Sequence, residues 1–335
     1  MIPHAEILAL RAEWGLRDDV IEKDYVLGWL LAAIASEPPL AQSWVFKGGT
    51  CLRKCYYETY RFSEDLDFTV INGGPETAEE LVPILRSVAD WLRDRSGIAI
   101  EVTPADIRRT RNRRGNDTTA VRIAFRGPRN PPSLPKVKID LTSDEVLATP
   151  VVRRSILHPY TDAADLTAQV TAYSIAELLA EKIRALVERC RPRDLYDVIN
   201  VFRHPELVGD PRPVRDALSS KCAHVGVDVP DAAAILASPF RPELDQEWAN
   251  MLGHQLPHLA PVSEYWTAIE AVFEWTSPAS HRRLKTDRNP ARLRRLKHAP
   301  APAAGWSSTT TSWAGTSTRC SRTTGRGSYS MRRIT

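Results

Sequence analysis

The first 165 residues alternate between helical and strand-like spacing of apolar positions. Residues 18–36 are expected to form a helix, because Asp18 or Asp19 can cap its start and Pro38 and Pro39 end it. Residues 66–70 place Leu, Phe and Val on alternate positions, as in a half-buried strand. Further strands are expected at 44–49, 98–102, 118–125, 136–142 and, more weakly, 151–157, and a second helix at 76–95.

From Tyr173 onward the spacing is helical, with helices expected at 174–189, 193–203, 212–221, 240–254 and 263–275. The change in pattern predicts a first domain over 1–165 and a helical domain over 166–298. Residues 301–335 contain fifteen Ser or Thr, five Arg and no acidic residue. Because such a composition cannot bury a core, 299–335 is expected to be a disordered basic tail or a frame-shifted C-terminus.

Composition adds the broad class of protein. The chain is 43% hydrophobic and 26% charged, as in ordinary globular proteins, and no apolar run reaches the length of a transmembrane helix. The charged residues near its start are unlike a secretory signal. The five cysteines form no C-x-x-C pair, which favours free thiols in a reducing cytoplasm.

The net charge of +4 is unevenly distributed. No acidic residue follows Asp287, whereas ten Lys or Arg do, so removing +10 from +4 leaves −6 for residues 1–287. Overall basicity is therefore poor evidence for nucleic-acid binding. Residues 107–129 are locally basic, and they either follow a phosphate backbone or form a solvated hairpin.

Two carboxylates share one face of the strand that includes residues 66–70. Because positions i and i+2 of a strand project to the same side, Asp65 and Asp67 lie side by side. Asp140 has the same setting in the strand over 136–142. If the two strands are neighbours, the three carboxylates converge and can hold Mg²⁺, with phosphate oxygens completing its shell. A solvent-facing polar edge is the alternative.

The preceding segment reads as strand, diglycine and helix. Gly48 and Gly49 carry no side chains, so their N–H groups can approach a phosphate, and the following helix points its N-terminus at it. Thr50 adds a hydroxyl there. A diglycine alone also suits a tight bend, but its combination with the two-aspartate strand favours nucleotide binding.

A further candidate element covers residues 172–202. Ser174 and Glu177 form an S-x-x-E capping box, so a helix begins there. Lys182 falls on the apolar stripe of this helix, where its ammonium needs either a buried carboxylate or a ligand phosphate. The exposed face of the helix is expected to carry Glu181, Arg184 and Glu188.

The next helix begins with Pro192 and places Asp194 in its first turn. Asp194 is either a partner of the helix dipole or a site residue. Tyr196 and Asp197 are expected to be structural.

The segments FKGGTCLRK, RFSEDLDF and AEKIRALVERCRPRDLYD resemble the AbiEii/AbiGii (MenT-type) toxins of the DNA polymerase β-like nucleotidyltransferase superfamily. The resemblance covers about residues 18–203, and 204–298 is similar only as a helical region. It implies an α+β fold, in which a mixed-sheet nucleotidyltransferase domain is followed by a helical domain that contributes Lys182 and Asp194 to the cleft.

The resemblance, together with the strand argument for Asp140, assigns three groups of residues. The catalytic group is Asp65, Asp67, Lys182, Asp194 and Ser63. The nucleotide-binding group is Gly48, Gly49, Thr50, Ser63, Lys182 and Arg53, the last of these because it lies one turn after the diglycine. The metal ligands are Asp65, Asp67 and Asp140. Arg61 either adds charge near the site or pairs with a structural carboxylate, and Asp140 or Asp194 would help deprotonate the attacking hydroxyl.

The function implied by the resemblance is that of a cytoplasmic toxin in a toxin–antitoxin or abortive-infection system. It transfers NMP from an NTP to the 3′ end of tRNA, using Mg²⁺ or alternatively Mn²⁺, and so blocks translation. A cognate antitoxin is the expected protein partner, and no membrane is involved. Two alternatives stay open: the same chemistry on a protein or small-molecule hydroxyl, and a non-catalytic module that binds nucleotide or RNA.

Overall fold

The computed structural model describes residues 1–58, 60–111, 115–204 and 209–277, all within one compact unit. Its sheet has eight strands in the order β3-β5-β6-β2-β1-β8-β7, with β4 also paired to β5. The strands are β1 Trp44–Lys47, β2 Asp65–Val70, β3 Ala99–Glu101, β4 Ile107–Arg111, β5 Asp117–Arg126, β6 Lys136–Thr142, β7 Val152–Ser155 and β8 Gln169–Ala172. The pairs β2–β6 and β1–β8 are parallel and the others antiparallel, so the sheet is mixed.

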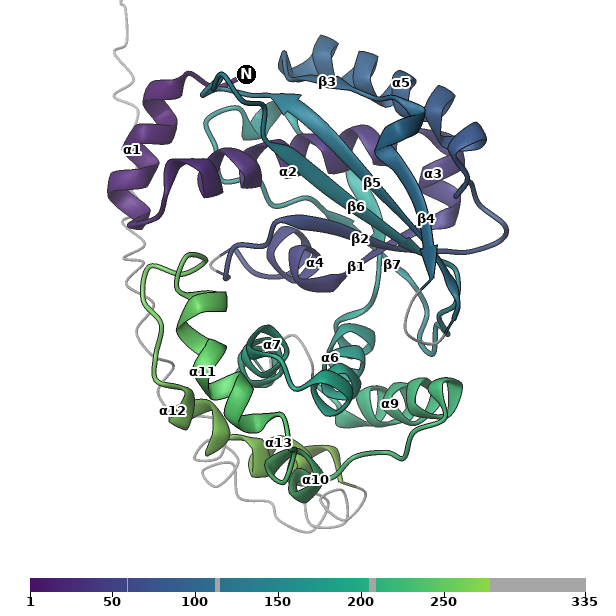
Figure 1. Ribbon diagram of the computed structural model, residues 1–335, viewed down its shortest axis with the longest axis vertical. Helices are drawn as coiled ribbons and strands as arrows, with labels where there is room; N and C mark the ends of the chain where they lie inside the picture. Colours follow the sequence, from purple (N-terminus) through teal and green to yellow (C-terminus); the bar gives the residue numbers. More distant parts are fainter. Residues whose placement is uncertain (59, 112–114, 205–208, 278–335) are drawn as a thin grey trace, which may run out of the picture. The chain divides into compact units, whose positions relative to one another are not determined.

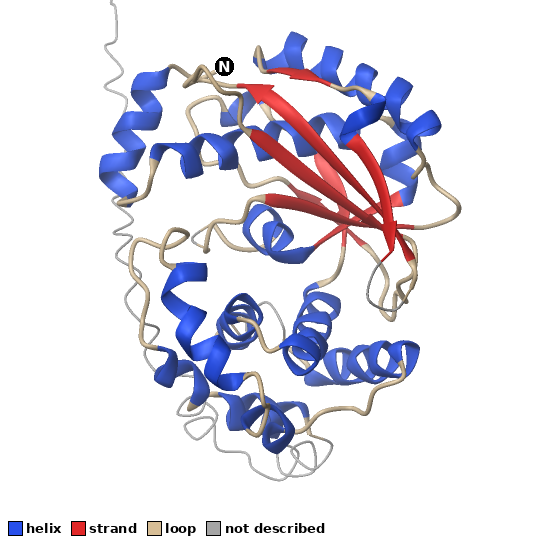
Figure 2. Ribbon diagram, in the orientation of Figure 1, coloured by secondary structure: helices blue, strands red, loops and turns tan. Residues whose placement is uncertain are grey.

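Helices flank the sheet in the first part of the chain and form all the regular structure described after β8 (Figure 2). The α-helices are α1 His4–Trp14, α2 Asp18–Ser36, α3 Pro38–Ser43, α4 Gly48–Cys55, α5 Ala78–Ser96, α6 Ile175–Arg189, α7 Pro192–Phe202, α9 Pro211–Val225, α10 Ala232–Leu236, α11 Arg241–Leu252, α12 Val262–Trp266 and α13 Ile269–Thr276. Two 3₁₀ turns, η1 Pro104–Asp106 and η2 Ala163–Asp165, complete the set. The α+β class, with a mixed sheet followed by helices, is confirmed.

The apolar face of the sheet packs against α2 and α5. Alternate residues of β6 are buried while Lys138, Asp140 and Thr142 on the other face remain partly accessible, as their spacing predicted. Helix α2 contacts α5, β2 and β8, and Figure 1 shows it running across the sheet with α5 beside it. This packing leaves the polar face of β2, β5 and β6 free to form a site.

Helix α2 carries a buried carboxylate, Asp24, that pairs with cations of α4. Asp24 is 1% exposed, and its carboxylate accepts hydrogen bonds from Arg53 Nε (2.6 Å), Lys54 Nζ (2.7 Å) and the Tyr160 hydroxyl (2.8 Å). Burial alone would raise the pKa of Asp24, but Arg53 and Lys54 lower it overall. Arg53 also donates to the Tyr60 carbonyl, so the structure places this expected nucleotide-binding residue in the core.

Several element boundaries differ from the expectation. Strands β4 and β8 were not predicted, and the helix expected at 263–275 is two short helices, α12 and α13. Strand β4 has no buried residue, so its apolar pattern could not reveal it, and it is held by pairing with β5. The domain boundary near residue 165 stays a prediction. Strand β8 continues the sheet beyond that point, to Ala172. The tail at 299–335 lies outside the described residues.

Four of the five cysteines lie in the described part of the chain. Cys51, Cys55, Cys190 and Cys222 are buried and form no disulfide, as their spacing predicted. Within the described residues, no helix is long and apolar enough to cross a membrane.

We expect Asp24→Asn to lower the free energy of unfolding by about 3–5 kcal/mol, because Arg53 and Lys54 would remain buried without a countercharge. Urea unfolding followed by circular dichroism measures the change. Asp90→Asn is the control, since Asp90 pairs with Arg93 at an exposed site and should cost less than about 1 kcal/mol. Equal losses in the two variants would contradict a stabilising role for the Asp24 network.

Candidate active site

The polar face of the sheet arranges charged side chains in rows across its strands. The register places Lys47 of β1 opposite Asp67 of β2, and Asp67 opposite Asp140 of β6. Toward the start of the two parallel strands, Asp65 lies opposite Lys138. The expectation that the two aspartate-bearing strands are neighbours is therefore confirmed, and Asp67 and Asp140 face each other directly.

Like charges crowd at this position. Burial and then the Asp140 carboxylate raise the pKa of Asp67 to about 6, and Lys47 and Lys182 offset this only in part. Burial likewise raises the pKa of Asp65. An ion pair between Lys138 Nζ and Asp140 Oδ2 at 2.6 Å supplies some compensation. A further positive charge near Asp67 and Asp140 would therefore be stabilising.

The donor set is consistent with a magnesium ion that also binds a phosphate. Across the described residues, no three Asp, Glu, His or Cys side chains are grouped closely enough to hold a metal by themselves. Asp65, Asp67 and Asp140 nevertheless share one sheet face and offer only carboxylate oxygens, which Mg²⁺ prefers, and Mg²⁺ commonly takes its remaining ligands from water and substrate phosphate. These residues therefore fit an ion shared with a phosphate.

The diglycine brings the start of α4 against these carboxylates. Gly48 has φ +80°, and a Cβ at this position would overlap the Asp67 carboxylate. A Cβ at Gly49 would meet the Arg61 guanidinium and lie 3.2 Å from Ser63 Oγ. No side chain caps α4, so the N–H groups of its first turn can take an anion. Both glycines are thus required by close approach, and Ser63 lies beside them.

Thr50 makes a structural contact, and its expected part in nucleotide binding stays a prediction. It is fully buried, and its hydroxyl donates to the backbone carbonyl of Asp65 at 2.5 Å. This hydrogen bond fixes the first residue of β2 against α4, so within the structure Thr50 positions Asp65.

Lys182 reaches the site from α6 and lies between two buried carboxylates. Its Nζ is 2.7 Å from Asp197 Oδ2 and 3.5 Å from Asp194 Oδ1. Arg189 binds the Asp194 carboxylate with both Nε (2.6 Å) and Nη2 (2.8 Å). Of the two anions that the sequence left open for the Lys182 ammonium, buried carboxylates are the ones observed.

Asp197 links Lys182 to the segment that precedes β2. Arg61 Nε and Nη2 donate to its two oxygens at 2.7 and 2.8 Å, and Tyr60 donates at 2.9 Å. Burial alone would raise the pKa of Asp197, but Arg61 and Lys182 lower it overall. Arg61 therefore pairs with a structural carboxylate. The three-residue spacing of Asp194 and Asp197, which puts both on one face of α7, was the available signal.

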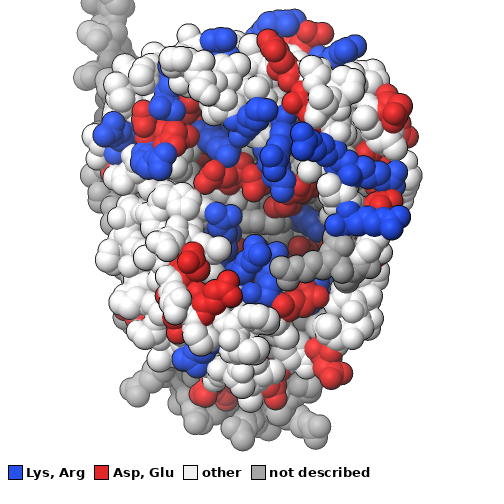
Figure 3. All heavy atoms as spheres, viewed as in Figure 1, with Lys and Arg blue, Asp and Glu red and all other residues white. Residues whose placement is uncertain are grey.

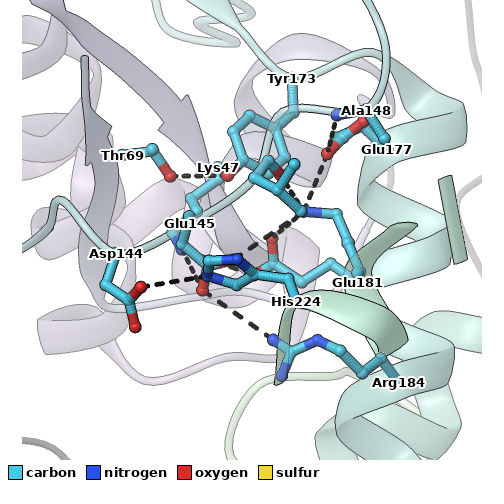
Figure 4. Close-up of polar contacts among 12 residues, drawn as sticks. Lys47, Thr69, Asp144, Glu145, Ala148, Tyr173, Glu177, Glu181, Arg184 and His224 are labelled. Atoms are coloured by element: carbon cyan, nitrogen blue, oxygen red, sulfur yellow. Dashed lines mark hydrogen bonds and ion pairs between the residues drawn. The ribbon is translucent and has the colours of Figure 1, made fainter. Parts of the chain in front are cut away.

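A second ionic cluster includes Lys47 and was not predicted from the sequence (Figure 4). Its cations are Lys47, Arg184 and Lys221, and its anions are Glu145, Glu177 and Glu181. Burial would raise the pKa of Glu181, but Lys47 and Lys221 lower it to about 2. Figure 4 shows Arg184 directed from α6 toward Glu145, 3.9 Å away. This cluster holds β1, α6 and α9 together next to Gly48.

Two expectations for α6 were wrong. Arg184 is buried and Glu181 is ion-paired with Lys47 and Lys221, rather than both being exposed, because α9 packs along α6. Only half of the capping box forms. Ser174 accepts a hydrogen bond from the Glu177 N–H, while the Glu177 carboxylate binds Lys221 and the N–H groups of residues 148 and 149.

These elements enclose a cavity of ≈ 550 Å³. The residues lining it include Lys47, Gly48, Asp67, Thr118, Arg122, Lys138, Asp140, Thr142, Lys182 and Arg189. Arg122 lies directly opposite Lys138 in the sheet, an arrangement of like charges that is unfavourable unless an anion lies between them. We call the cavity of ≈ 550 Å³ the nucleotide-sized cavity. Sequence reasoning missed Arg122 because it belonged only to a generally basic segment.

Basic side chains gather beside the hollow in this face of the molecule (Figure 3). Arg108, Arg109 and Arg111 of β4 and Arg122 and Arg126 of β5 are exposed. Within the described residues of 107–129, β4 and β5 therefore form an antiparallel pair with a basic surface.

Comparisons with known proteins bear on the family and the fold of the chain. A family model described as "Nucleotidyl transferase AbiEii toxin, Type IV TA system" matches residues 29–275. MenT4, a nucleotidyltransferase toxin from Mycobacterium tuberculosis H37Rv, has a similar structure, with TM-score 0.58 and 19% identity over 89% of this chain and 98% of that one. CdnC of E. coli MS115-1, solved with ATP, matches at TM-score 0.21 and 14% identity over 67% and 72% of the two chains. No curated protein matches the sequence.

Gly48→Ala should abolish nucleotide and metal binding, because the added methyl overlaps the Asp67 carboxylate and strains a positive φ. Isothermal titration calorimetry with Mg²⁺ and a non-hydrolysable NTP measures binding. Gly73→Ala is the matched control: Gly73 has φ +65° but nothing within 4 Å of its Cβ position, so it should lose only about 1–2 kcal/mol of stability and keep binding. Loss of binding in both variants would assign the effect to backbone strain alone.

Magnesium binding should depend on pH through Asp67. Its pKa of about 6 means that the metal-free carboxyl carries a proton below this pH and must release it to bind the ion. Apparent Mg²⁺ affinity should therefore fall by up to about tenfold per pH unit below about 6, and level off above about 7. Titration in two buffers of different ionisation enthalpy should show release of about one proton at the lower pH. A flat profile would contradict the assignment of Asp67 as a ligand.

Proposed function

Because the chain belongs to the AbiEii family of nucleotidyltransferase toxins, we propose that it transfers NMP from an NTP to the 3′ end of tRNA in a Mg²⁺-dependent reaction. The observation that carries this proposal is the contact between the diglycine turn and Asp67. It puts the uncapped N-terminus of α4, which can take a phosphate, against the carboxylates that can hold a metal. The cavity in front of them has room for a nucleotide.

The triphosphate would lie between α4 and the cations of the opposite wall. The Gly48 and Gly49 N–H groups approach it from one side, and Lys182 approaches from α6. Arg122 and Lys138, which lie opposite each other in the sheet and line the cavity, offer further positive charge, although Lys138 is also paired with Asp140. Such fixed charges stabilise the negative charge that develops on the leaving pyrophosphate.

Asp65, Asp67 and Asp140 would hold the magnesium ion, which neutralises phosphate charge and favours in-line displacement when bound. Asp140 accepts the proton of the attacking hydroxyl in this proposal, because it lies in the cavity, partly accessible. Asp194 is a poor base: it is fully buried, and Lys182 and Arg189 lower its pKa against the effect of burial. Its proposed role is to position Lys182.

Transfer to tRNA is supported by the basic surface beside the cavity. Arg108, Arg109 and Arg111 are exposed on β4, next to Arg122 on β5. Closely spaced arginines suit a phosphate backbone. Membership of a type IV toxin family supports a cognate antitoxin as the protein partner in the cytoplasm.

Asp65→Asn should reduce NMP transfer by about 10³-fold, since a metal ligand contributes several kcal/mol of charge stabilisation. Purified protein is incubated with each α-³²P-labelled NTP, with and without tRNA, and the products are separated on a denaturing gel. Asp90→Asn, on the exposed side of α5, is the charge-matched control and should transfer normally.

Label on tRNA that disappears with EDTA is the expected result. Label on protein alone would support the alternative acceptor. Toxicity that survives Asp65→Asn while NTP binding is lost would support the non-catalytic module.

A further inference from the structure

A second cavity of ≈ 420 Å³ opens where the parallel strands β2 and β6 begin. Its wall combines the start of α2, the residue before β2, the start of β6 and the segment after α11. The charged and polar residues that line it are Arg17, Asp19, Lys23, Glu64, Lys136 and His254. None of them belongs to the nucleotide-sized cavity.

The two cavities occupy successive positions along the same sheet face. Lys136 lines the second cavity, and Lys138 and Asp140, at the next two positions on that face of β6, line the first. Glu64, the residue before β2, lines the second cavity, and Asp67 of β2 lines the first. Asp65 lies between them, so the carboxylates proposed to hold the metal separate the two spaces.

The second cavity is dominated by hydrogen-bond donors. Glu64 is satisfied by Lys23 Nζ at 3.0 Å and by His254 Nε2 at 3.3 Å, and Asp19 is paired with Arg17. Lys136 is exposed and has no carboxylate within ion-pair distance among the described residues. The acids are thus already paired, and the unpaired charge is a cation, as a phosphodiester site requires.

An in-line displacement needs the attacking and leaving oxygens on opposite sides of the phosphorus. The leaving pyrophosphate is proposed to lie by Gly48 and Lys182, which places it in the first cavity beside Asp67. The attacking hydroxyl must then approach from the side of Asp65. The second cavity is the space available on that side.

We propose that the second cavity is the acceptor subsite, and that it binds the phosphodiester preceding the 3′-terminal nucleotide of a polynucleotide, with Lys136 as its free cation. This inference rests on the proposed function and deepens it. The acceptor 3′ oxygen forms a bond to the α-phosphorus, the bond between that phosphorus and the bridging oxygen of pyrophosphate breaks, and the hydroxyl proton passes to Asp140.

The test is a pair of charge variants at residue 136. Lys136→Gln should raise the KM for tRNA several-fold and Lys136→Glu by about tenfold or more, with the KM for NTP and the melting temperature unchanged. Lys136→Arg should restore the wild-type KM. Arg86→Glu is the matched control, since Arg86 is exposed on α5, which packs on the other face of the sheet.

Binding without catalysis separates this inference from the proposed function. Fluorescence anisotropy of a labelled single-stranded RNA oligonucleotide is recorded in EDTA at several salt concentrations. Lys136→Gln should weaken binding and reduce the slope of log K against log salt by about 0.7, the value for one lost phosphate contact on a single strand. Arg86→Glu should leave both unchanged.

If Asp65→Asn did not reduce NMP transfer, the proposed function would be contradicted, but the RNA-binding measurement would still test the acceptor subsite. The acceptor subsite itself is overturned if Lys136→Glu leaves tRNA KM and oligonucleotide binding unchanged. It is also overturned if this variant raises the KM for NTP instead, because the second cavity would then hold the nucleotide, or if a protein acceptor proves equally sensitive to residue 136.

Discussion

The site depends on the ion pairs of one buried carboxylate, that of Asp197. It binds Arg61 from the segment before β2 and Lys182 from α6, so one side chain fixes two cations from regions far apart in the sequence. Removing a partner from such a buried network leaves charge uncompensated, at a cost of about 3–5 kcal/mol. The arrangement of Lys182 relative to Ser63 and Asp65 therefore follows from ion pairing in the core between the sheet and the helices.

The front of the site has the opposite character. Asp65, Asp67 and Asp140 lie on one sheet face, where burial and the neighbouring Asp140 carboxylate raise the pKa of Asp65 and of Asp67. Gly48 keeps the chain so close to Asp67 that no side chain could intervene. The ion pairs that Lys47 and Lys182 make with buried carboxylates therefore support three aspartates whose own negative charges are not balanced. Such an arrangement is typical of functional sites, where the local cost is offset when the ligand binds.

The sequence allowed the fold class and many elements to be predicted. Strands β2, β5 and β6 bury mainly alternate residues, and α2 begins at aspartates and ends before prolines. Strand β4 was not predictable from such a pattern, since it buries nothing and exists through pairing with β5. The same limit applies to charges. Glu181 and Arg184 have the spacing of an exposed helix face, and only the packing of α9 across α6 makes that face internal.

Local motifs also do not reveal which charged side chains will form ion pairs in the core instead of facing the cavity. Arg53 lies one turn from the diglycine, yet the turn of α4 directs it toward Asp24 instead of the cavity. Arg122, in a segment with no motif, reaches the cavity because β5 pairs with β6 in a register that places it opposite Lys138. Strand register thus decides which cations face the carboxylates. Since a shift of one residue would turn β5's side chains to the other face, the apolar contacts of Val121 and Ile123 with the core also determine the charge of the site.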